Sequence, residues 1–175
     1  MATGDDKPSA ERVLKEAGWF PGRSVDCEKE MALLRLCGFE PHDAVEPWFR
    51  EYAGLTVSAG EDTEIRIGDE YGFRQYVPIQ IHELERQAGV ALVSVATDGA
   101  TTWYLDPLGG IWGAIQWTYG KLGENLRDAL QAVLDGRQSL KLMDEFWDPT
   151  REEDRAAYRQ SLKFQAAWNA AQEQS

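Results

Sequence analysis

Residues 17–23, "AGWFPGR", place two large aromatic side chains where neither a helix nor a strand can continue. Gly18 stops a helical pattern, and Pro21 with Gly22 turns the chain sharply. We expect Trp19 to tuck its ring under this turn and Arg23 to reach backbone carbonyls or a nearby acid. The stretch is therefore interpreted as a structural clamp between two helices and not as an active site.

Helical patterns lie on both sides of this turn. The first helix is predicted over residues 9–17, and a second begins after Asp26 as its N-cap and runs to Cys37. A third helix is expected after Asp43, which with Glu46 three residues later resembles a capping box.

After residue 55 the hydrophobic period changes from helical to alternating, which is typical of strands. A hairpin is indicated by the Asp98-Gly99 turn. Residues 79–89 are ambiguous and are compatible with a short helix. Strands are predicted over residues 55–60, 63–69, 71–78, 90–96, 101–106 and 111–117.

Helical period returns in "GENLRDALQAVLDG", residues 123–136, and Thr150 with Glu153 marks the start of a final helix. Helices, then strands, then helices indicate an α+β fold, with an antiparallel meander sheet flanked by helices and an additional C-terminal helix. The expected organisation is a flexible N-terminus over 1–8, an α+β domain over 9–136, and an extension over 137–175 whose long helix packs on or beside the domain.

Composition points to a protein of a reducing compartment. Cys27 and Cys37 would lie roughly 15 Å apart on one helix, too far for a disulfide. No apolar run is long enough to cross a bilayer, and the first 13 residues lack the regions of a secretion signal. We therefore expect a cytoplasmic location. The sequence sets no oligomeric state and is compatible with a monomer.

The formal net charge of the 175 residues is −12, and residues 55–106 carry nine acids against three bases. Such a surface repels nucleic acid and anionic membranes and attracts basic partners, although plain solubility is an alternative explanation. The predicted partner-binding face consists of Glu61, Asp62, Glu64, Asp69, Glu70, Glu83 and Trp112.

Signals for catalysis are missing. Neither His42 nor His82 has a metal-ligand partner three or four residues away, and neither cysteine stands in a reactive motif. The glycine-rich stretch 107–113 matches no phosphate-binding loop. We predict no catalytic residue, no metal and no cofactor. Trp103 and Trp117 are expected in the core, whereas Trp112 is equally compatible with the core and with an exposed binding face.

Two longer stretches, "AGWFPGRSVD" (17–26) and "GFEPHDAVEPWFREYAGLTV" (38–57), resemble the third subfamily of the SUKH superfamily of bacterial immunity proteins. "WYLDPLGGIWG" (103–113) resembles the family's hairpin strand, and "GKLGENLRDALQAVLDG" (120–136) its closing helix. Ala53 departs from the pattern, because it replaces the first glycine of a pair whose second member is Gly54. The matching positions are Ala17, Gly18, Trp19, Pro21, Gly22, Arg23, Val25, Pro41, Ala44, Trp48, Phe49, Tyr52, Gly54 and Leu55.

The resemblance implies a SUKH-like fold and a binding role. Proteins of this family are typically made beside a secreted or contact-delivered toxin and neutralise it by docking on it. Such toxins are often nucleases or deaminases, which tend to be basic, so that an acidic face would compete with nucleic acid for them. Two alternatives stay open: a regulatory or scaffolding module of the same superfamily that binds proteins, and a hydrolase with a carboxylate site.

Overall fold

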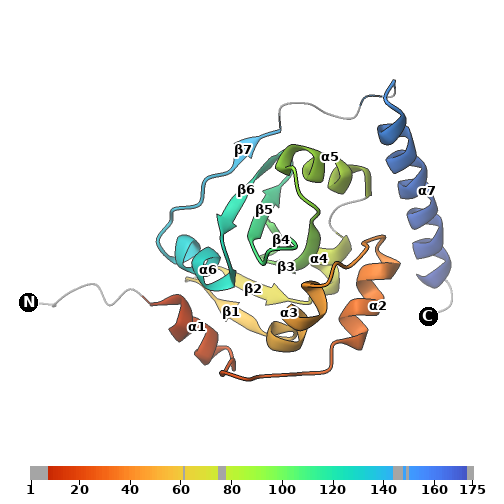
Figure 1. Ribbon diagram of the computed structural model, residues 1–175. Coiled ribbons are helices and arrows are strands. Elements are labelled where there is room, and N and C mark those ends of the chain that lie inside the picture. Colours follow the sequence, from red (N-terminus) through yellow and green to blue (C-terminus); the bar gives the residue numbers. More distant parts are fainter. Residues whose placement is uncertain (1–7, 61, 75–77, 144–147, 149, 173–175) are drawn as a thin grey trace, which may run out of the picture.

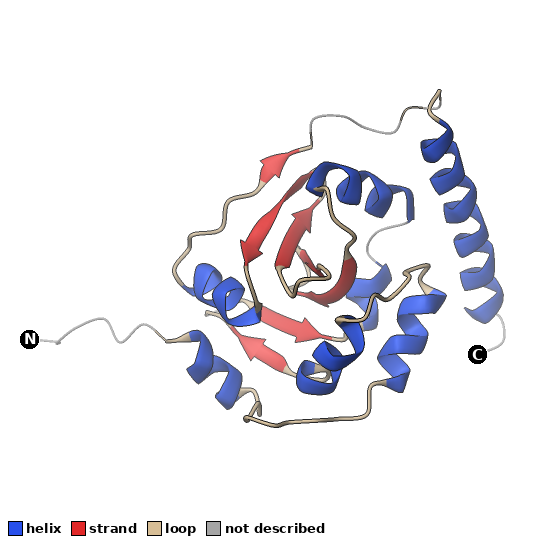
Figure 2. Ribbon diagram, viewed as in Figure 1, coloured by secondary structure: helices blue, strands red, loops and turns tan. Residues whose placement is uncertain are grey.

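The structure is a computed structural model that describes residues 8–60, 62–74, 78–143, 148 and 150–172. Within this part of the chain, helices α1 to α7 surround one curved antiparallel sheet (Figures 1 and 2). The α+β class and the meander sheet flanked by helices are confirmed. No helix in the described ranges combines the length and the apolar character needed to span a membrane.

The first two helices begin where their caps predict. In α1 (Ala10–Glu16) the Ser9 side chain accepts a hydrogen bond from the Arg12 amide. Before α2 (Glu28–Leu36) the Asp26 carboxylate accepts one from the Glu28 amide at 3.0 Å. Each interaction satisfies one of the amides that a helix N-terminus leaves unpaired.

The capping box predicted at the third helix is wrong. Helix α3 (Val45–Tyr52) follows Ala44, which makes no side-chain capping bond. Glu46 instead pairs with Arg50 one turn along the helix, at 2.8 Å. An ion pair at this spacing competes for the carboxylate that the capping box would have used.

In the described ranges seven strands pair in chain order, each antiparallel to the next. Every residue of β3 and β4 is buried, because helices and loops cover both faces of the sheet at its centre. The strands are β1 (Thr56–Ser58), β2 (Glu64–Ile67), β3 (Val93–Thr97), β4 (Thr102–Leu105), β5 (Ile111–Ile115), β6 (Thr118–Gly123) and β7 (Lys141–Leu142).

The strand predicted over residues 71–78 is wrong for residues 71–74 and 78, and residues 75–77 lie outside the described ranges. The structure has the short helix α4 (Glu70–Arg74) there, and Pro78 opens helix α5 (Pro78–Ala88). The Asp69 carboxylate accepts a bond from the Tyr71 amide at 2.7 Å, which favours a helical start over a strand. Proline is well tolerated in the first turn of a helix, so its reading as the end of a strand was mistaken.

Two further expectations fail at the hairpin joining β5 and β6. Residues 118–123 form a strand, although the resemblance placed part of them in the closing helix, which is α6 (Leu126–Leu134) and starts at the Asn125 cap. Trp117 is 48% exposed and not in the core, because it sits in a two-residue turn beside Gln116, whose φ is 51°. Trp103 is buried as predicted.

Residues after 136 add to both the sheet and the helices. Strand β7 pairs with the free edge of β6, and a Cβ atom at Gly120 would collide with the Ser139 carbonyl that crosses it. The final helix, α7 (Glu152–Gln172), runs along one side of the molecule and contacts α5 and α2 (Figure 1). The expected Thr150–Glu153 capping box is replaced by a bond from the Thr150 hydroxyl to Asp148.

Candidate partner-binding surfaces

The turn at residues 19–23 is tied to the end of α3. Trp19 is 4% exposed, and its indole Nε1 donates a hydrogen bond to Glu51 Oε1 at 3.0 Å. The guanidinium of Arg23 donates to the carbonyl oxygens of Glu51 and Ala53, at 2.6 and 2.8 Å. The planar guanidinium of Arg23 thus satisfies two carbonyls that the end of α3 leaves without helical partners.

The same turn also contacts the neighbouring helix α6. The Arg127 guanidinium at the start of α6 lies 4.7 Å from the centre of the Trp19 ring. Gly22 and Gly54 hold φ values of 82° and 78°, in the region that favours glycine. These contacts hold α1, α3 and α6 together, which is a structural role.

The predicted acidic residues do not form one cluster. Asp62 lies in the loop joining β1 and β2, and Glu64 is exposed on the outward face of β2. Asp69 and Glu70 follow the opposite end of that strand. At about 3.4 Å per residue, Glu64 and Asp69 are separated by more than 10 Å. Glu61 falls outside the described residues.

Arginines reduce the negative charge of this strip. Arg66, the next outward position of β2, contacts Asp69 at 3.0 Å, and Arg74 contacts Glu70 at 3.6 Å. Asp62 and Glu64 make no ion pair with any described lysine or arginine. The unneutralised charge of the predicted face is therefore concentrated at its hairpin end.

Glu83 does not belong to an exposed face. Its side chain is buried, with Arg86 Nη2 at 2.5 Å and Gln87 Nε2 at 2.7 Å from Oε1. The prediction of Glu83 as a surface residue is corrected, because the helical turn of α5 directs it inward, where the arginine compensates its charge.

Trp112 is half-buried, and Asp106 holds its ring. The indole Nε1 donates to Asp106 Oδ2 at 2.9 Å, while Oδ1 accepts bonds from the amides of Leu108 and Gly110. Burial acts to raise the pKa of Asp106, but these three donors outweigh it, so the pKa lies below its usual value. One edge of the ring stays accessible to a partner.

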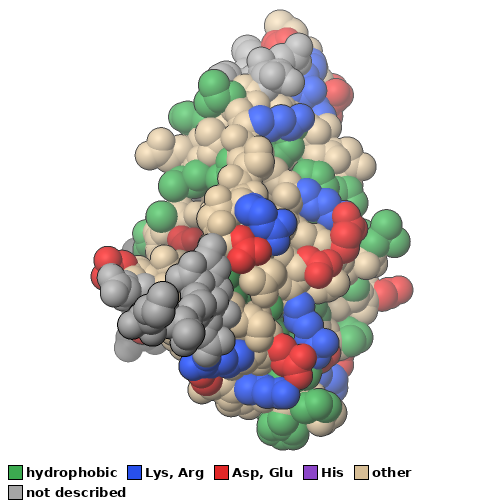
Figure 3. Space-filling view, turned by 90° about the vertical axis from the view of Figure 1, so that its left-hand side faces the viewer, with side chains coloured by type: hydrophobic (Ala, Val, Ile, Leu, Met, Phe, Trp, Pro, Cys, Tyr) green, Lys and Arg blue, Asp and Glu red, His purple; other side chains and the backbone are tan. Residues whose placement is uncertain are grey.

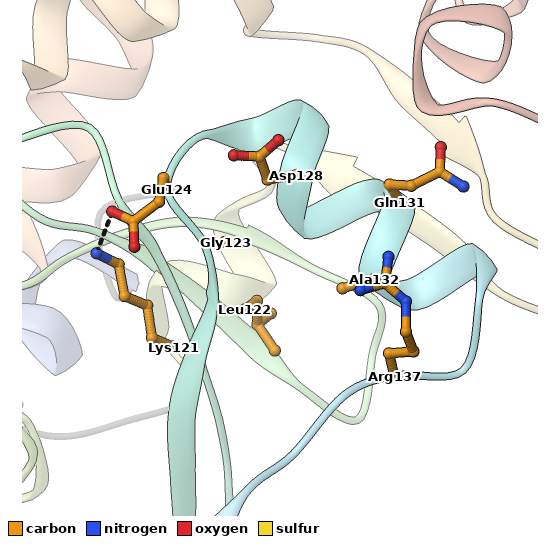
Figure 4. Close-up of a pocket in the computed structure, with 8 residues that line it drawn as sticks. All are labelled: Lys121, Leu122, Gly123, Glu124, Asp128, Gln131, Ala132 and Arg137. Carbon is orange, nitrogen blue, oxygen red and sulfur yellow. Dashed lines mark hydrogen bonds and ion pairs between the residues drawn. The ribbon is translucent and has the colours of Figure 1, made fainter.

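The face that carries α1 and α6 mixes both signs of charge (Figure 3). A hollow of about 420 Å³ lies there between β6 and α6, where Lys121 pairs with Glu124, and Asp128 and Arg137 lie further along the wall (Figure 4). Two cationic and two anionic side chains line this hollow, so their formal charges cancel and do not favour an ion of either sign.

A groove on another side has a different character. It has a volume of about 560 Å³ and lies between the loop after α2, helix α5, the start of β3, and helix α7. Glu40, Glu85 and Glu153 line it, together with His82, and no lysine or arginine does. The groove is therefore acidic around an otherwise largely apolar lining.

Beside this groove a buried charge network holds α7 to α5. Asp154 is fully buried, with Oδ1 at 3.1 Å from His82 Nε2 and Oδ2 at 2.9 Å from Arg151 Nε. Burial acts to raise the pKa of Asp154, but hydrogen bonds from the Asp148 amide and His82, with the charge of Arg151, bring it below its usual value.

An oriented histidine in a groove raises the question of catalysis. A covalent mechanism would need a hydroxyl, thiol or amine nucleophile near His82. The groove lining contains no serine, threonine, cysteine, tyrosine or lysine. Among the described residues, no three His, Cys, Asp or Glu side chains are grouped to hold a metal ion. The network instead has the contacts of a helix tether.

Comparison with known families decides the identity. A family model described as SUKH-3 immunity protein matches residues 7–136. The chain belongs to this family. No curated protein and no solved structure gave a match.

In this SUKH-3 protein the matched residues contain the Trp19–Arg23 turn, strands β1 to β6, and α6. Ala53, which replaces a glycine of the family pattern, has φ −56° and ψ 141°, a conformation open to any L-residue. The substitution is thus compatible with the turn, since only Gly54 needs a positive φ.

The SUKH-3 match ends at residue 136, before β7 and α7. The wall of the acidic groove that α7 forms therefore lies outside the match. Sequence reasoning did not identify Glu40, Glu85 or Glu153 as site residues. Helical spacing places Glu85 one turn beyond His82, and this spacing could have indicated that the two side chains share a site. The secondary structure of residues 79–89 was, however, ambiguous from the sequence. The contribution of Glu153 depends on how α7 docks, and no local pattern encodes that.

Proposed function

We propose that this SUKH-3 immunity protein binds a cognate bacterial toxin and neutralises it by covering the surface with which the toxin meets its substrate. The observation that carries the proposal is the family match over residues 7–136. The acidic groove beside α7 is compatible with a binding role. In this proposal the protein works by occupying a surface of the toxin.

The toxin in this proposal is a basic nuclease or deaminase. Enzymes that hold nucleic acid present lysine and arginine to its phosphates. A protein with net charge −12 is attracted to such a surface over the range of a Debye length and competes with the phosphates for it. Both cysteines are buried free thiols, which supports a cytoplasmic location where the toxin would be met.

The proposed contact face includes the hairpin end of the β1–β2 strip. Asp62 and Glu64 are exposed there and make no ion pair with a described residue. Asp69 and Glu70 already pair with arginines, so they would add less to association. Trp112 supplies a partly exposed aromatic edge of the kind found in protein interfaces.

The experiment is charge reversal in the full chain. Asp62→Lys with Glu64→Lys should weaken the complex with the toxin encoded beside the chain, mostly by slowing association at low salt. Binding would be followed by surface plasmon resonance at several salt concentrations. Glu28→Lys with Asp43→Lys is the matched control, because both residues are exposed and the double change alters net charge equally.

Equal loss in both double variants would show that only overall charge matters and would remove the hairpin end from the contact face. Absence of any complex with the wild-type chain would contradict the function itself.

A further inference from the structure

The groove between the core and α7 has an apolar floor. Phe39, Ile81 and Leu92 line it and are 6%, 7% and 1% exposed, and Ala157 from α7 closes the far side. A volume of about 560 Å³ falls within the range of pockets that hold small ligands or inserted side chains. An inserted group could therefore bury a hydrocarbon stem against this floor.

The charge in the groove is not compensated. Glu85 is half-buried, and its Oε1 accepts a bond from the Leu92 amide at 2.8 Å. Glu40 and Glu153 are exposed, and none of the three pairs with a described lysine or arginine. Burial, helped by the nearby charge of Glu40, raises the pKa of Glu85, although the Leu92 bond and the histidines His82 and His42 oppose the change. A partly desolvated carboxylate of this kind is stabilised when a cation enters.

We propose that this groove receives an arginine or lysine side chain of the bound toxin, its stem on the apolar floor and its charged head at Glu85 and Glu153. The inference rests on the proposed function, since it names a contact of the same partner. An arginine fits better than a lysine, because its planar fork can bond carboxylates on two sides of the groove. Burying the stem while pairing the head is the usual way in which long cationic side chains enter such sites.

The extension after residue 136 makes this site. Glu153 and Ala157 belong to α7, which the bond between Asp154 and His82 of α5 joins to the core. The family match covers the Phe39 and Glu85 side of the groove only. The extension therefore adds a contact for the partner to a core that has its own.

A short peptide can test the groove without the toxin. The probe is a blocked Gly-Arg-Gly peptide titrated into the ¹⁵N-labelled full chain at low salt, and the isosteric citrulline peptide is the uncharged control. We expect saturable shifts of the Leu92 and Ala157 amide signals with the arginine peptide and none with citrulline. Glu85→Gln, which keeps an oxygen for the Leu92 amide, should weaken binding by about tenfold, because a hydrogen bond to a charged group is lost.

Glu28→Gln at the start of α2 is the matched variant, because Glu28 is exposed and does not line the groove, and it should leave the peptide affinity unchanged. Silent Leu92 and Ala157 signals, an equal response to citrulline, or normal affinity in Glu85→Gln would each overturn the inference. If the arginine peptide does not bind but the toxin complex forms, the groove inference is wrong and the proposed function is unaffected. If the peptide binds but no toxin complex forms, the proposed function is wrong and the groove is still a cation site.

Discussion

Trp19 is the residue on which the N-terminal half depends most. Its buried ring lies between Glu51 of α3 and Arg127 of α6. Trp19→Ala should lower the free energy of unfolding by about 3–5 kcal/mol, since it leaves a large cavity. Trp19→Phe keeps most of the ring and loses the bond to Glu51, so it should cost about half as much. Urea denaturation of both variants checks this order, and a loss under about 1 kcal/mol in Trp19→Ala would contradict the clamp.

Asp106 gives a prediction on pH. Its folded pKa is lowered, so its contribution to stability is fully present above the unfolded value of about 3.9 and is lost as pH falls through the folded pKa. Asp106→Asn should destabilise the protein by about 1.5–3 kcal/mol at neutral pH, because bonds to a charged acceptor are lost. The gap between wild type and variant in urea unfolding should narrow below about pH 4. A stability difference between wild type and Asp106→Asn that stays constant from pH 7 to pH 3 would contradict a stabilising role of the Asp106 carboxylate.

The turn after the first helix could be predicted from single residues. Gly18, Pro21 and Gly22 predicted the turn. Backbone carbonyls were among the partners expected for Arg23, and it bonds two of them. Charge was harder to place. Glu83 and Glu64 are both glutamates in acidic stretches of the sequence, yet Glu83 is buried against Arg86 and Glu64 is exposed. The difference arises because the position of Glu83 on α5 directs its side chain inward.

At the scale of elements, the fully buried Asp154 carboxylate of α7 bonds His82 of α5, and Ala157 is buried beside it. Asp154→Ala removes one partner of a buried pair, and such changes typically cost about 3–5 kcal/mol. We expect faster amide exchange along α7, with β3 and β4 unchanged. Glu152→Ala is the control, since its exposed pairs with Arg155 and Arg159 contribute about 0–1 kcal/mol each. Exchange that rises equally in the sheet would show that α7 is not a separately held element.

Elements with strong periodicity were predicted, and those decided by tertiary contacts were not. The continuous apolar, β-branched run before Asp98 was predicted as a buried strand, and it contains β3. Residues 71–78 carry aromatic and branched side chains typical of strands, but the Asp69 cap and Pro78 favour helices. Strand β6 contains two glycines and a lysine, so its alternation is weak, and pairing with β5 rather than propensity makes it a strand.

The whole molecule combines a family core with an extension after residue 136 that lies outside the SUKH-3 match. The meander order of the sheet could be predicted, since each strand pairs with the next. The acidic groove could not, because Glu40, Glu85 and Glu153 come from parts of the chain far apart in sequence. The net charge follows from the amino-acid composition, but its distribution over the surface depends on which arginines lie beside which acids.

The most direct test of the central claim is a titration of toxin activity. A fixed amount of the toxin domain encoded beside this chain would be mixed with increasing full-length protein, and residual toxin activity would be read at equilibrium. We predict that activity falls linearly to zero at equimolar protein and returns when high salt separates the two, with the toxin unchanged in mass. Full toxin activity in excess protein, or a chemically altered toxin after substoichiometric treatment, would contradict a mechanism of binding.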